Sequence, residues 1–357
     1  MKTLFESVFV GGIHLKNRTI RSATFEAPAV EGGCFAENLI PIYKNLAEGE
    51  VGAIVTGMVG VDESSCLLSG TVKAYERKFV SELHKLTELV HKYGCKIIVQ
   101  INHCGLKSMY SDEGGRLLAP SDWKVSPDKI AQEMTSEDIA AVSESFAKAA
   151  VWCREAGADG VQIHCAHGYL LSQFLSSHFN KRQDEYGGDI DGRGRIVFEV
   201  YDAIRRHTGH DYPIWMKINC KDMAEDGTNA EEYLRFCTKL AERGINAIEV
   251  SGGIAIGLKS SPVPIIRKET DEGYFAAEAA ALAERVKASV ISVCGHRTPG
   301  SMEEWLNKSG IEAISLSRPL ISEPGLVKRW QTGDRSKARC ISCNKCFRAG
   351  EFGCRTF

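Results

Sequence analysis

Short apolar runs alternate along the chain with longer stretches in which apolar residues recur at helical spacing. This alternation is typical of an α/β fold, because parallel strands that are covered on both faces are almost continuously apolar. Ile97-Ile98-Val99 is one such run. The pattern predicts strands at Arg18–Ala23, Ala53–Gly57, Lys96–Ile101, Gly160–His164, Ile214–Ile218, Ala247–Ser251, Val290–Cys294 and Ala313–Ser317.

The stretches between the strands have the period of amphipathic helices. They cover Asn38–Ala47, Glu76–Tyr93, Ser136–Ala156, Arg195–His207, Glu231–Arg243, Phe275–Lys287 and Ser301–Lys308. Thr135 precedes the third helix and is followed by Glu137 and Asp138, which is typical of a capped N-terminus with acids in the first turn. Strands that alternate with helices throughout favour a closed (β/α)8 TIM barrel, although periodicity alone also allows an open doubly wound sheet.

Two segments lie outside this alternation. Phe9–Leu15 has the pattern of a small hairpin, which in a barrel would plug the end formed by the strand N-termini. Residues 336–357 form a Cys-rich C-terminal tail. Since no low-complexity tract or Pro/Ser-rich linker separates the rest, we expect one barrel domain, residues 1–335, with the tail, residues 336–357, packed on it.

Polar or glycine residues stand at the end of almost every predicted strand. They are Ser22 and Thr24, Gly57, Gln100, His164, Lys217, Ser251 with Gly252 and Gly253, Gly295, and Ser317 with Arg318. Active sites of (β/α)8 barrels form at the C-terminal ends of the strands. The sequence therefore predicts a functional site at that end of the barrel.

His164 and His167 stand three positions apart where the fourth strand passes into a loop. Two imidazole N–H groups there would stabilise negative charge that develops on a substrate carbonyl. Tyr169 would donate a proton to a neighbouring carbon. The alternatives are structural histidines or a metal pair, but the His-Glu-x-x-His pattern of zinc hydrolases is absent from the sequence.

Further polar residues at the strand ends suit a phosphorylated heterocycle. Backbone amides around Gly295, with Arg318 as a bidentate clamp, would bind a phosphomonoester, although a surface ion pair of Arg318 with Glu323 is the alternative. Gln100 offers both a donor and an acceptor to the edge of a ring. A different class of enzyme, a lyase or aldolase, would use Lys217 to form a Schiff base, but this leaves the other residues without a joint role.

Together these motifs resemble the old yellow enzyme family, the NADH:flavin oxidoreductases, over almost the whole chain. The first-strand motif of that family is similar to Leu15-Lys16-Asn17-Arg18 with Ser22, and its third-strand segment to Gln100-Ile101-Asn102-His103-Cys104-Gly105. The fourth-strand signature resembles His164-Cys165-Ala166-His167-Gly168-Tyr169-Leu170. Asn180-Lys181-Arg182 and Tyr186-Gly187-Gly188 resemble the long loop that follows. Such a combination is far more specific than a lone glycine motif.

The resemblance implies FMN held without covalent linkage at the barrel mouth and reduced by NADH or NADPH. It implies that Gln100 binds the pyrimidine edge of the flavin and that Lys217 lies near N1 and the C2 carbonyl. The remaining cofactor contacts would come from Gly295, Ser317 and Arg318 at the phosphate, and from Ser22, Ala23, Thr24, Gly57 and Gly253 around the ring.

The resemblance also implies an ene-reductase. His164 and His167 would hold the carbonyl oxygen of an enone or enoate, flavin N5 would deliver a hydride to the β-carbon, and Tyr169 would protonate the α-carbon. Phe25 departs from the family pattern, since many relatives place a Thr or Cys there that tunes the flavin. The substrate itself depends on the loops at 107–116 and 259–274, whose shape the sequence does not fix.

The tail contains Cys340, Cys343, Cys346 and Cys354 in a C-x2-C-x2-C-x7-C pattern. Thiolates suit an iron–sulfur cluster or zinc, and the alternative is a group of thiols that holds no metal. The tail resembles the [4Fe–4S] segment of the 2,4-dienoyl-CoA reductase and trimethylamine dehydrogenase branch, with shorter gaps and without the flavin/pyridine-nucleotide domain expected there. A cluster would favour our second hypothesis, an FMN/iron–sulfur electron-transfer or dehydrogenase subunit that works with a partner protein.

The composition excludes several other classes. With 44 Lys and Arg against 46 Asp and Glu, the formal net charge is −2, so we expect neither nucleic acid nor a membrane surface as partner. No apolar stretch long enough to span a bilayer and no secretory signal is apparent. The 13 cysteines lie mostly within apolar segments, which suits thiols in a reducing compartment. We expect a cytoplasmic homo-oligomer that acts on a small molecule.

Overall fold

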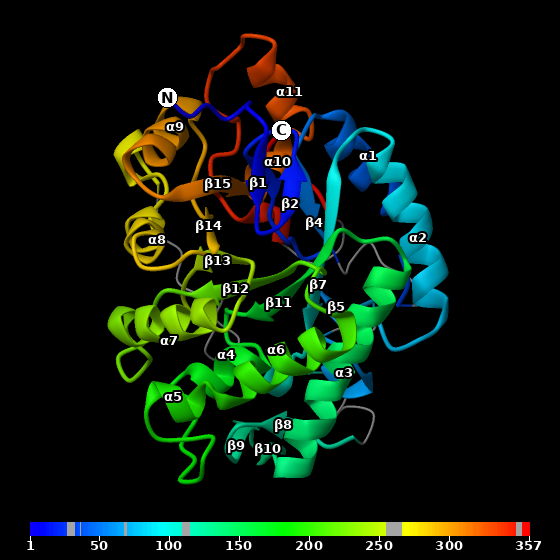
Figure 1. Cartoon of the computed structure of the whole chain (residues 1–357), viewed down its shortest axis with the longest axis vertical. Coiled ribbons are helices and arrows are strands. Elements are labelled where there is room, and N and C mark those ends of the chain that lie inside the picture. Colours follow the sequence, from blue (N-terminus) through cyan, green and yellow to red (C-terminus); the bar gives the residue numbers. More distant parts are fainter. Residues whose placement is uncertain (27–32, 36, 68–69, 109–114, 255–265, 348–351) are drawn as a thin grey trace.

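The computed structural model describes residues 1–26, 33–35, 37–67, 70–108, 115–254, 266–347 and 352–357. Its centre is a closed ring of eight parallel strands, in the order β3-β4-β7-β11-β12-β13-β14-β15 and back to β3. The strands are β3 (Thr19–Arg21), β4 (Ala53–Val55), β7 (Lys96–Asn102), β11 (Gly160–Cys165), β12 (Ile214–Asn219), β13 (Ala247–Ser251), β14 (Ser289–Ser292) and β15 (Ile311–Leu316). The predicted (β/α)8 barrel is confirmed, with all its strands within a few residues of the expected bounds (Figure 1).

Helices surround the ring and bury one face each against it (Figure 1). They are α1 (Ile40–Glu48), α2 (Lys78–His91), α3 (Ser136–Glu155), α6 (Arg195–Thr208), α7 (Ala230–Glu242), α8 (Ala276–Ala283) and α9 (Pro299–Lys308), followed by α10 (Arg318–Ser322) and α11 (Leu326–Gln331). The predicted cap of α3 is present, because the Thr135 side chain accepts a hydrogen bond from the Asp138 amide at 3.2 Å. The short helices α4 (Leu170–Leu175) and α5 (Ile190–Arg193) were not predicted.

The expected N-terminal hairpin is formed by β1 (Val8–Val10) and β2 (Ile13–Leu15). Its apolar side chains are buried in one cluster with residues inside the barrel, including Ile98 and Trp215. The indole N–H of Trp215 donates to the carbonyl of Gly11 at 3.2 Å. Gly11 has a φ of 49°, and a Cβ there would lie 2.6 Å from that indole nitrogen, so this turn requires glycine. The hairpin therefore plugs the end of the barrel where the strands begin.

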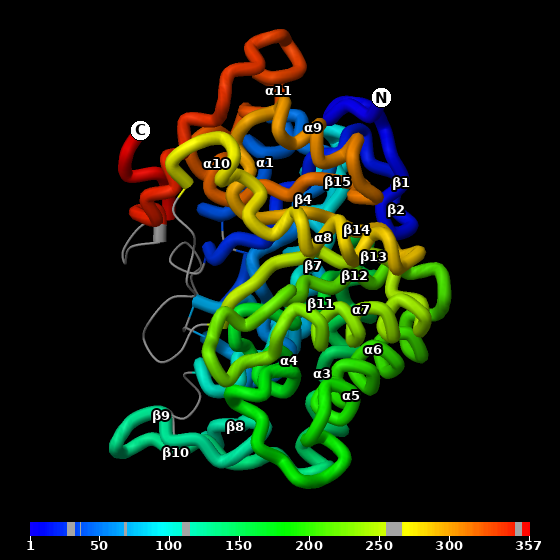
Figure 2. Tube along the Cα trace, turned by 90° about the vertical axis from the view of Figure 1, so that its left-hand side faces the viewer, coloured from blue at the N-terminus to red at the C-terminus, as the bar shows by residue number. Residues whose placement is uncertain are grey.

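Three further strands form a small sheet outside the barrel. They are β8 (Leu118–Ala119), β9 (Trp123–Ser126) and β10 (Lys129–Glu133), and they project from the rest of the molecule in Figure 2. Two others, β5 (Val59–Gly60) and β6 (Val72–Lys73), extend from the end of β7. All five lie in connections that follow barrel strands, at the end of the barrel where the site was predicted.

The tail follows α11 and lies on the side of the barrel opposite the hairpin (Figure 2). The Ala338 amide donates to the carbonyl of Arg297 at 2.9 Å, which ties the tail to the loop after β14. The domain boundary at 335/336 stays a prediction, although α11 ends at Gln331, just before it. Across the described ranges, no helix combines the length and the apolarity that crossing a membrane requires.

Candidate active site

A cavity of about 670 Å³ opens at the C-terminal ends of the strands. This volume is in the range of sites for cofactors and drug-sized ligands. Of the residues predicted for the site, the cavity is lined by Ser22, Ala23, Thr24, His167, Tyr169, Lys217, Gly295, Ser317 and Arg318. Residues from five barrel strands, or from the turns that follow them, thus meet around one space, as the sequence predicted.

Lys217 forms part of a buried network at the floor of this cavity. Its Nζ donates to Ser22 Oγ at 2.8 Å and to Glu249 Oε2 at 3.1 Å. The Glu249 carboxylate also accepts from Ser22 Oγ at 2.8 Å and from Gln162 Nε2 at 3.1 Å. Gln162 Oε1 in turn accepts from Gln100 Nε2 at 2.8 Å. The network joins three predicted flavin contacts through two residues, Gln162 and Glu249, that the sequence analysis missed.

The opposite charges of Lys217 and Glu249 stabilise each other in this network. Burial raises the pKa of Glu249, but attraction to Lys217 and the hydrogen bonds from its neighbours outweigh burial, so that its pKa lies below the usual value. Glu249 is therefore an anion that neutralises the buried ammonium of Lys217. An ammonium has three donors, and two are directed at Ser22 and Glu249, so one remains for a ligand in the cavity.

His167 and Tyr169 line one wall of the cavity, and the His164 ring packs against both of them. The two imidazole rings are 5.4 Å apart at their centroids, and the rings of His164 and Tyr169 are 4.8 Å apart. His167 has a left-handed backbone with a φ of 61°, and its Nε2 is 2.7 Å from Ser251 Oγ. His164 is buried beneath the lining residues, and its Nδ1 has no hydrogen-bond partner among the described residues. A buried polar atom of this kind is satisfied by an ordered water, an ion or a ligand.

Burial fixes the protonation states of this trio. Burial lowers the pKa of His167 to about 3, with further lowering by Lys217 and Lys107. Burial and the nearby cations also lower the pKa of His164 well below the usual value. Burial raises the pKa of Tyr169 above its usual value. At neutral pH both imidazoles are thus uncharged, each with one N–H to donate, and the phenol keeps its proton.

Lys107 is the second lysine in the cavity wall. It ends the 3-10 helix η3 (Gly105–Lys107), and its Nζ donates to the carbonyl of His167 at 2.6 Å. The same Nζ lies 4.6 Å from the centroid of the Tyr169 ring. Loss of hydration lowers the pKa of Lys107 to about 8. This residue was noted in sequence only as the start of a variable loop.

The turns after β14 and β15, where the sequence predicts a phosphate site, line one part of the cavity. Cys294 and Gly295 both have left-handed backbones, with φ of 82° and 83°. A Cβ on Gly295 would lie 2.7 Å from the Tyr274 ring, so glycine is needed for this approach. Arg318 Nη1 donates to Asn344 Oδ1 at 2.7 Å. The alternative considered for Arg318, an ion pair with Glu323, is not formed, since Glu323 binds Arg329 instead.

Together these features fit FMN. The cavity has the required volume, a cationic clamp and a glycine turn for a phosphate at one end, and a lysine donor for a heterocycle at its floor. Gln100, the predicted partner of the pyrimidine edge, is buried outside the cavity lining, with its Nε2 bonded to Gln162. A Schiff-base lyase fits less well, because Lys217 is held by Glu249 as a charged ammonium, whereas a nucleophilic amine needs its proton removed.

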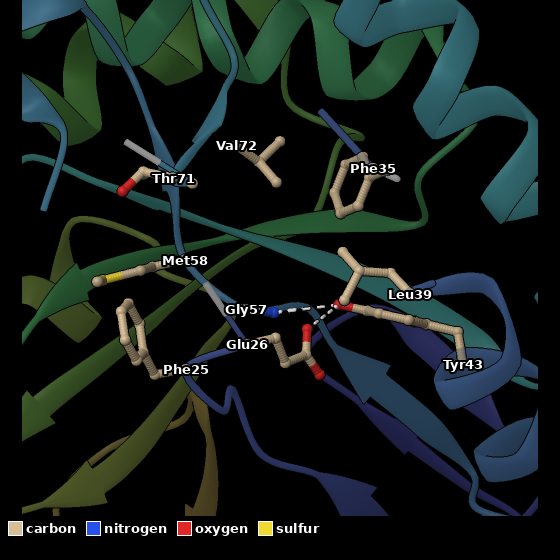
Figure 3. A pocket seen from close by; sticks show the side chains of 10 residues that line it. Phe25, Glu26, Phe35, Leu39, Tyr43, Gly57, Met58, Thr71 and Val72 are labelled. Carbon is tan, nitrogen blue, oxygen red and sulfur yellow. Dashed lines mark hydrogen bonds between the residues drawn. The ribbon is translucent and has the colours of Figure 1, made fainter. Parts of the chain in front are cut away.

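Gly57 and Gly253 do not line this cavity. Gly57 lies beside a second space of about 20 Å³, where its amide donates to Tyr43 Oη at 3.2 Å and Tyr43 Oη donates to Glu26 Oε2 at 2.9 Å (Figure 3). The Gly253 amide donates to the carbonyl of Lys221 at 2.9 Å. Phe25 lines both spaces and separates them, so the departure from the family pattern at this position contributes an apolar ring to the cofactor cavity.

The four tail cysteines line one small space of about 20 Å³ that also borders Arg318. Their donor chemistry suits a cluster or zinc. Within the part of the chain that the structure describes, however, no three His, Cys, Asp or Glu side chains are arranged to hold a metal ion. A metal at Cys340, Cys343, Cys346 and Cys354 therefore stays a prediction.

The sequence matches a model of the NADH:flavin oxidoreductase / NADH oxidase family over residues 3–337. A metal reductase of Desulforamulus reducens is 33% identical over 351 residues, which are 97% of this chain and 51% of that protein. An NADPH dehydrogenase of a Geobacillus species is 30% identical over 325 residues, which are 90% of this chain and 91% of that protein.

Solved structures of related proteins share the fold of this chain. The 2-naphthoyl-CoA reductase in complex with 2-naphthoyl-CoA has a TM-score of 0.86 at 25% identity, over 94% of this chain and 53% of that one. Morphinone reductase in complex with tetrahydroNAD has a TM-score of 0.78 at 22% identity, over 93% of this chain and 91% of that one, and shares the fold.

The chain spans about half the length of the metal reductase and of the NADH oxidase of Thermoanaerobacter brockii, with 51% and 52% of those proteins covered. It spans nine-tenths of the NADPH dehydrogenase, at 91%. Because the family match covers residues 3–337, which include the whole barrel, this chain belongs to the NADH:flavin oxidoreductase / NADH oxidase family, the FMN-binding oxidoreductases that include old yellow enzyme.

Proposed function

We propose that this chain is an FMN-dependent NAD(P)H oxidoreductase that reduces the C=C bond of α,β-unsaturated carbonyl compounds. The observation that carries the proposal is the placement of His167 and Tyr169 on the wall of the cavity that Lys217 and Arg318 also line, with the His164 ring packed against both of them. When bound, FMN supplies the hydride chemistry, with NADH or NADPH as the source of electrons.

Two neutral imidazoles hold the substrate carbonyl. Because the pKa values of both histidines are lowered, each ring carries a single N–H, which it donates to the carbonyl oxygen. With Ser251 Oγ as the donor to Nε2 of His167, the Nδ1–H of that ring is left for the substrate. As the β-carbon gains a hydride, negative charge develops on this oxygen, and the two hydrogen bonds strengthen.

Tyr169 completes the reduction by transferring its phenolic proton to the α-carbon. Its raised pKa keeps the proton in place until the enolate-like charge has formed. The product then carries one hydride and one proton across the former double bond, and solvent reprotonates the phenolate. Lys107, whose Nζ lies over the Tyr169 ring, stabilises that phenolate while it exists.

The test is a pair of anaerobic reactions followed by the visible spectrum of the protein. NADH or NADPH should bleach the flavin bands, and 2-cyclohexenone should restore them with formation of one equivalent of cyclohexanone. Bleaching that no enone or enoate reverses would reject the reductase and keep only the flavoprotein.

A second function is favoured by one specific observation. The space lined by the tail cysteines and the cofactor cavity share Arg318 and Asn344 in their walls. An iron–sulfur cluster at the tail would therefore lie beside the cofactor, as a one-electron carrier to a partner protein requires. Iron and acid-labile sulfide in anaerobically purified protein, lost in Cys343→Ser, would support this electron-transfer subunit, and their absence would reject it.

A further inference from the structure

The wall of the active-site cavity is cationic. Four of its side chains, Lys107, Lys217, Arg297 and Arg318, are basic, and no Asp or Glu among the described residues lines it. Cations that lose water on burial are normally paired with an anion, because an unpaired buried charge is costly. We therefore looked for a negatively charged partner of each of the four cations.

Two of the four are paired within the protein. Lys217 Nζ lies 3.1 Å from Glu249 Oε2, and Arg297 Nε lies 3.5 Å from Glu272 Oε1. Arg318 is not paired with a carboxylate in the described chain, but it lies beside Gly295, where the phosphate of FMN is expected. Lys107 remains.

Lys107 has no carboxylate partner among the described residues. Its Nζ makes one hydrogen bond, to the carbonyl of His167 at 2.6 Å, and faces the ring of Tyr169 at 4.6 Å. Neither contact supplies a full negative charge. Its pKa, lowered to about 8, reflects the resulting loss of hydration. An ammonium with further donors is thus held beside the proton donor, on the wall where the substrate must lie.

We propose that Lys107 determines specificity by binding an anionic group of the substrate, in addition to the carbonyl that His164 and His167 hold. A carboxylate is the simplest such group. The inference rests on the proposed function, and it narrows the substrate class from enones in general to unsaturated carbonyl compounds that carry a separate negative charge. A charge-assisted hydrogen bond to the half-buried ammonium of Lys107 is stronger than one between neutral groups, so it favours a charged substrate over an uncharged one.

The test compares a cyclohexenone that bears a carboxylate on its ring with the methyl ester of the same compound. Binding to the oxidised holoenzyme is measured by the change in the flavin spectrum, so that no turnover is needed. We expect the wild-type Kd for the carboxylate to be at least about ten-fold below that for the ester. Equal Kd values would overturn the proposal.

Variants of Lys107 separate charge from structure. Lys107→Gln keeps a donor for the His167 carbonyl and removes the charge, so the two Kd values should become equal through weaker binding of the carboxylate alone. Lys107→Arg should keep the preference. Lys85→Gln, on the exposed face of α2, is the matched control and should leave both values unchanged. If Lys107→Gln weakens the ester and the carboxylate equally, Lys107 only positions His167 and the proposal fails.

Binding and turnover distinguish this proposal from the reductase. Carboxylate binding that depends on Lys107, without reduction of either compound, would support the anion site and reject the ene-reductase. Reduction of both compounds with equal Kd values would support the ene-reductase and reject the anion site.

Discussion

Lys217 and Glu249 occupy paired positions on the adjacent strands β12 and β13, with Nζ and Oε2 3.1 Å apart. Both side chains are almost fully buried, and Lys217 lines the cofactor cavity. On the other side of Lys217, His164 of β11 occupies the paired position. One layer of the barrel therefore holds His164, Lys217 and the counter-ion Glu249 on three neighbouring strands, with the first two proposed to bind the substrate carbonyl and the flavin.

This pairing predicts the effect of Glu249→Gln on stability. The variant leaves the Lys217 ammonium buried without an anion, and breaking a buried pair by removing one partner costs about 3 kcal/mol or more. The free energy of unfolding from urea denaturation should fall by that amount. Glu242→Gln, at the exposed end of α7, should change it by less than about 0.5 kcal/mol. Equal losses in the two variants would contradict a role for the pair.

The histidines predict the pH dependence of substrate reduction. Since the pKa of His167 is lowered to about 3 from the usual 6.5, His167 does not change charge in the neutral range. The rate of flavin reoxidation by an enone should therefore show no inflection near the usual imidazole pKa. His167→Asn, which keeps one N–H donor, should retain more activity than His167→Ala, for which we expect a loss of about 10²-fold to 10³-fold. An inflection near 6.5 that disappears in His167→Asn would contradict neutral histidines.

The same lowered pKa values predict how stability changes with pH. The unfolded chain protonates these histidines below about 6.5, whereas the folded protein keeps His167 neutral until about 3. The unfolded state thus binds more protons in this window, and stability must fall as the pH falls through it. The slope of unfolding free energy against pH should be smaller in His167→Asn, as urea titrations at several pH values will measure. An unchanged slope would show that other groups carry the dependence.

Asn344 couples the tail to the cofactor clamp. Its Oδ1 accepts from Arg318 Nη1 at 2.7 Å, and the carbonyl of Ser342 is 3.4 Å from the same nitrogen. Asn344→Ala should therefore raise the Kd for FMN by roughly three-fold to ten-fold, since one hydrogen bond to a charged group is lost. Arg318→Met should raise it further. Fluorescence titration of the apoprotein with FMN will measure both, and Arg206→Met on the exposed face of α6 is the control. An unchanged Kd in Arg318→Met would move the phosphate site elsewhere.

Much of this architecture could be predicted from sequence, because burial on both faces leaves a direct apolar signal in barrel strands. All eight strands were predicted, but the apolar signal does not fix where a strand ends, as the strand predicted at Val290–Cys294 illustrates. The strand stops at Ser292, and Cys294 already has a left-handed backbone that leads into the phosphate turn. Helix α8 ends at Ala283 rather than Lys287, since periodicity cannot locate a terminus without a capping residue.

The small sheet β8–β10 was missed although its signal is present. Pro127-Asp128 is a turn sequence between two short alternating runs, Trp123–Ser126 and Lys129–Glu133. The runs are rich in polar residues and mostly exposed, so they differ little from an ordinary loop. Their position after β7 gave no reason to expect strands there.

Glu249 was missed for a different reason. A single acid within the apolar run Ala247–Ser251 has no partner in the sequence, because its counter-ion is 32 residues away. Opposite charges at the same place in two consecutive strands were the available signal, but their pairing depends on a register that only the closed barrel fixes. The role of Lys107 could not be predicted from sequence either, because it depends on the absence of a carboxylate partner among the described residues of the folded chain.

The most direct test of the account is a rapid-mixing measurement of both half-reactions in Tyr169→Phe. We expect reduction of the flavin by NADH or NADPH to proceed at close to the wild-type rate, because Tyr169 takes no part in it. Reoxidation by 2-cyclohexenone should slow by about 10²-fold or more, because the α-carbon has lost its proton donor. Equal loss in both half-reactions, or no loss in either, would contradict Tyr169 as the proton donor and with it the proposed mechanism of C=C reduction.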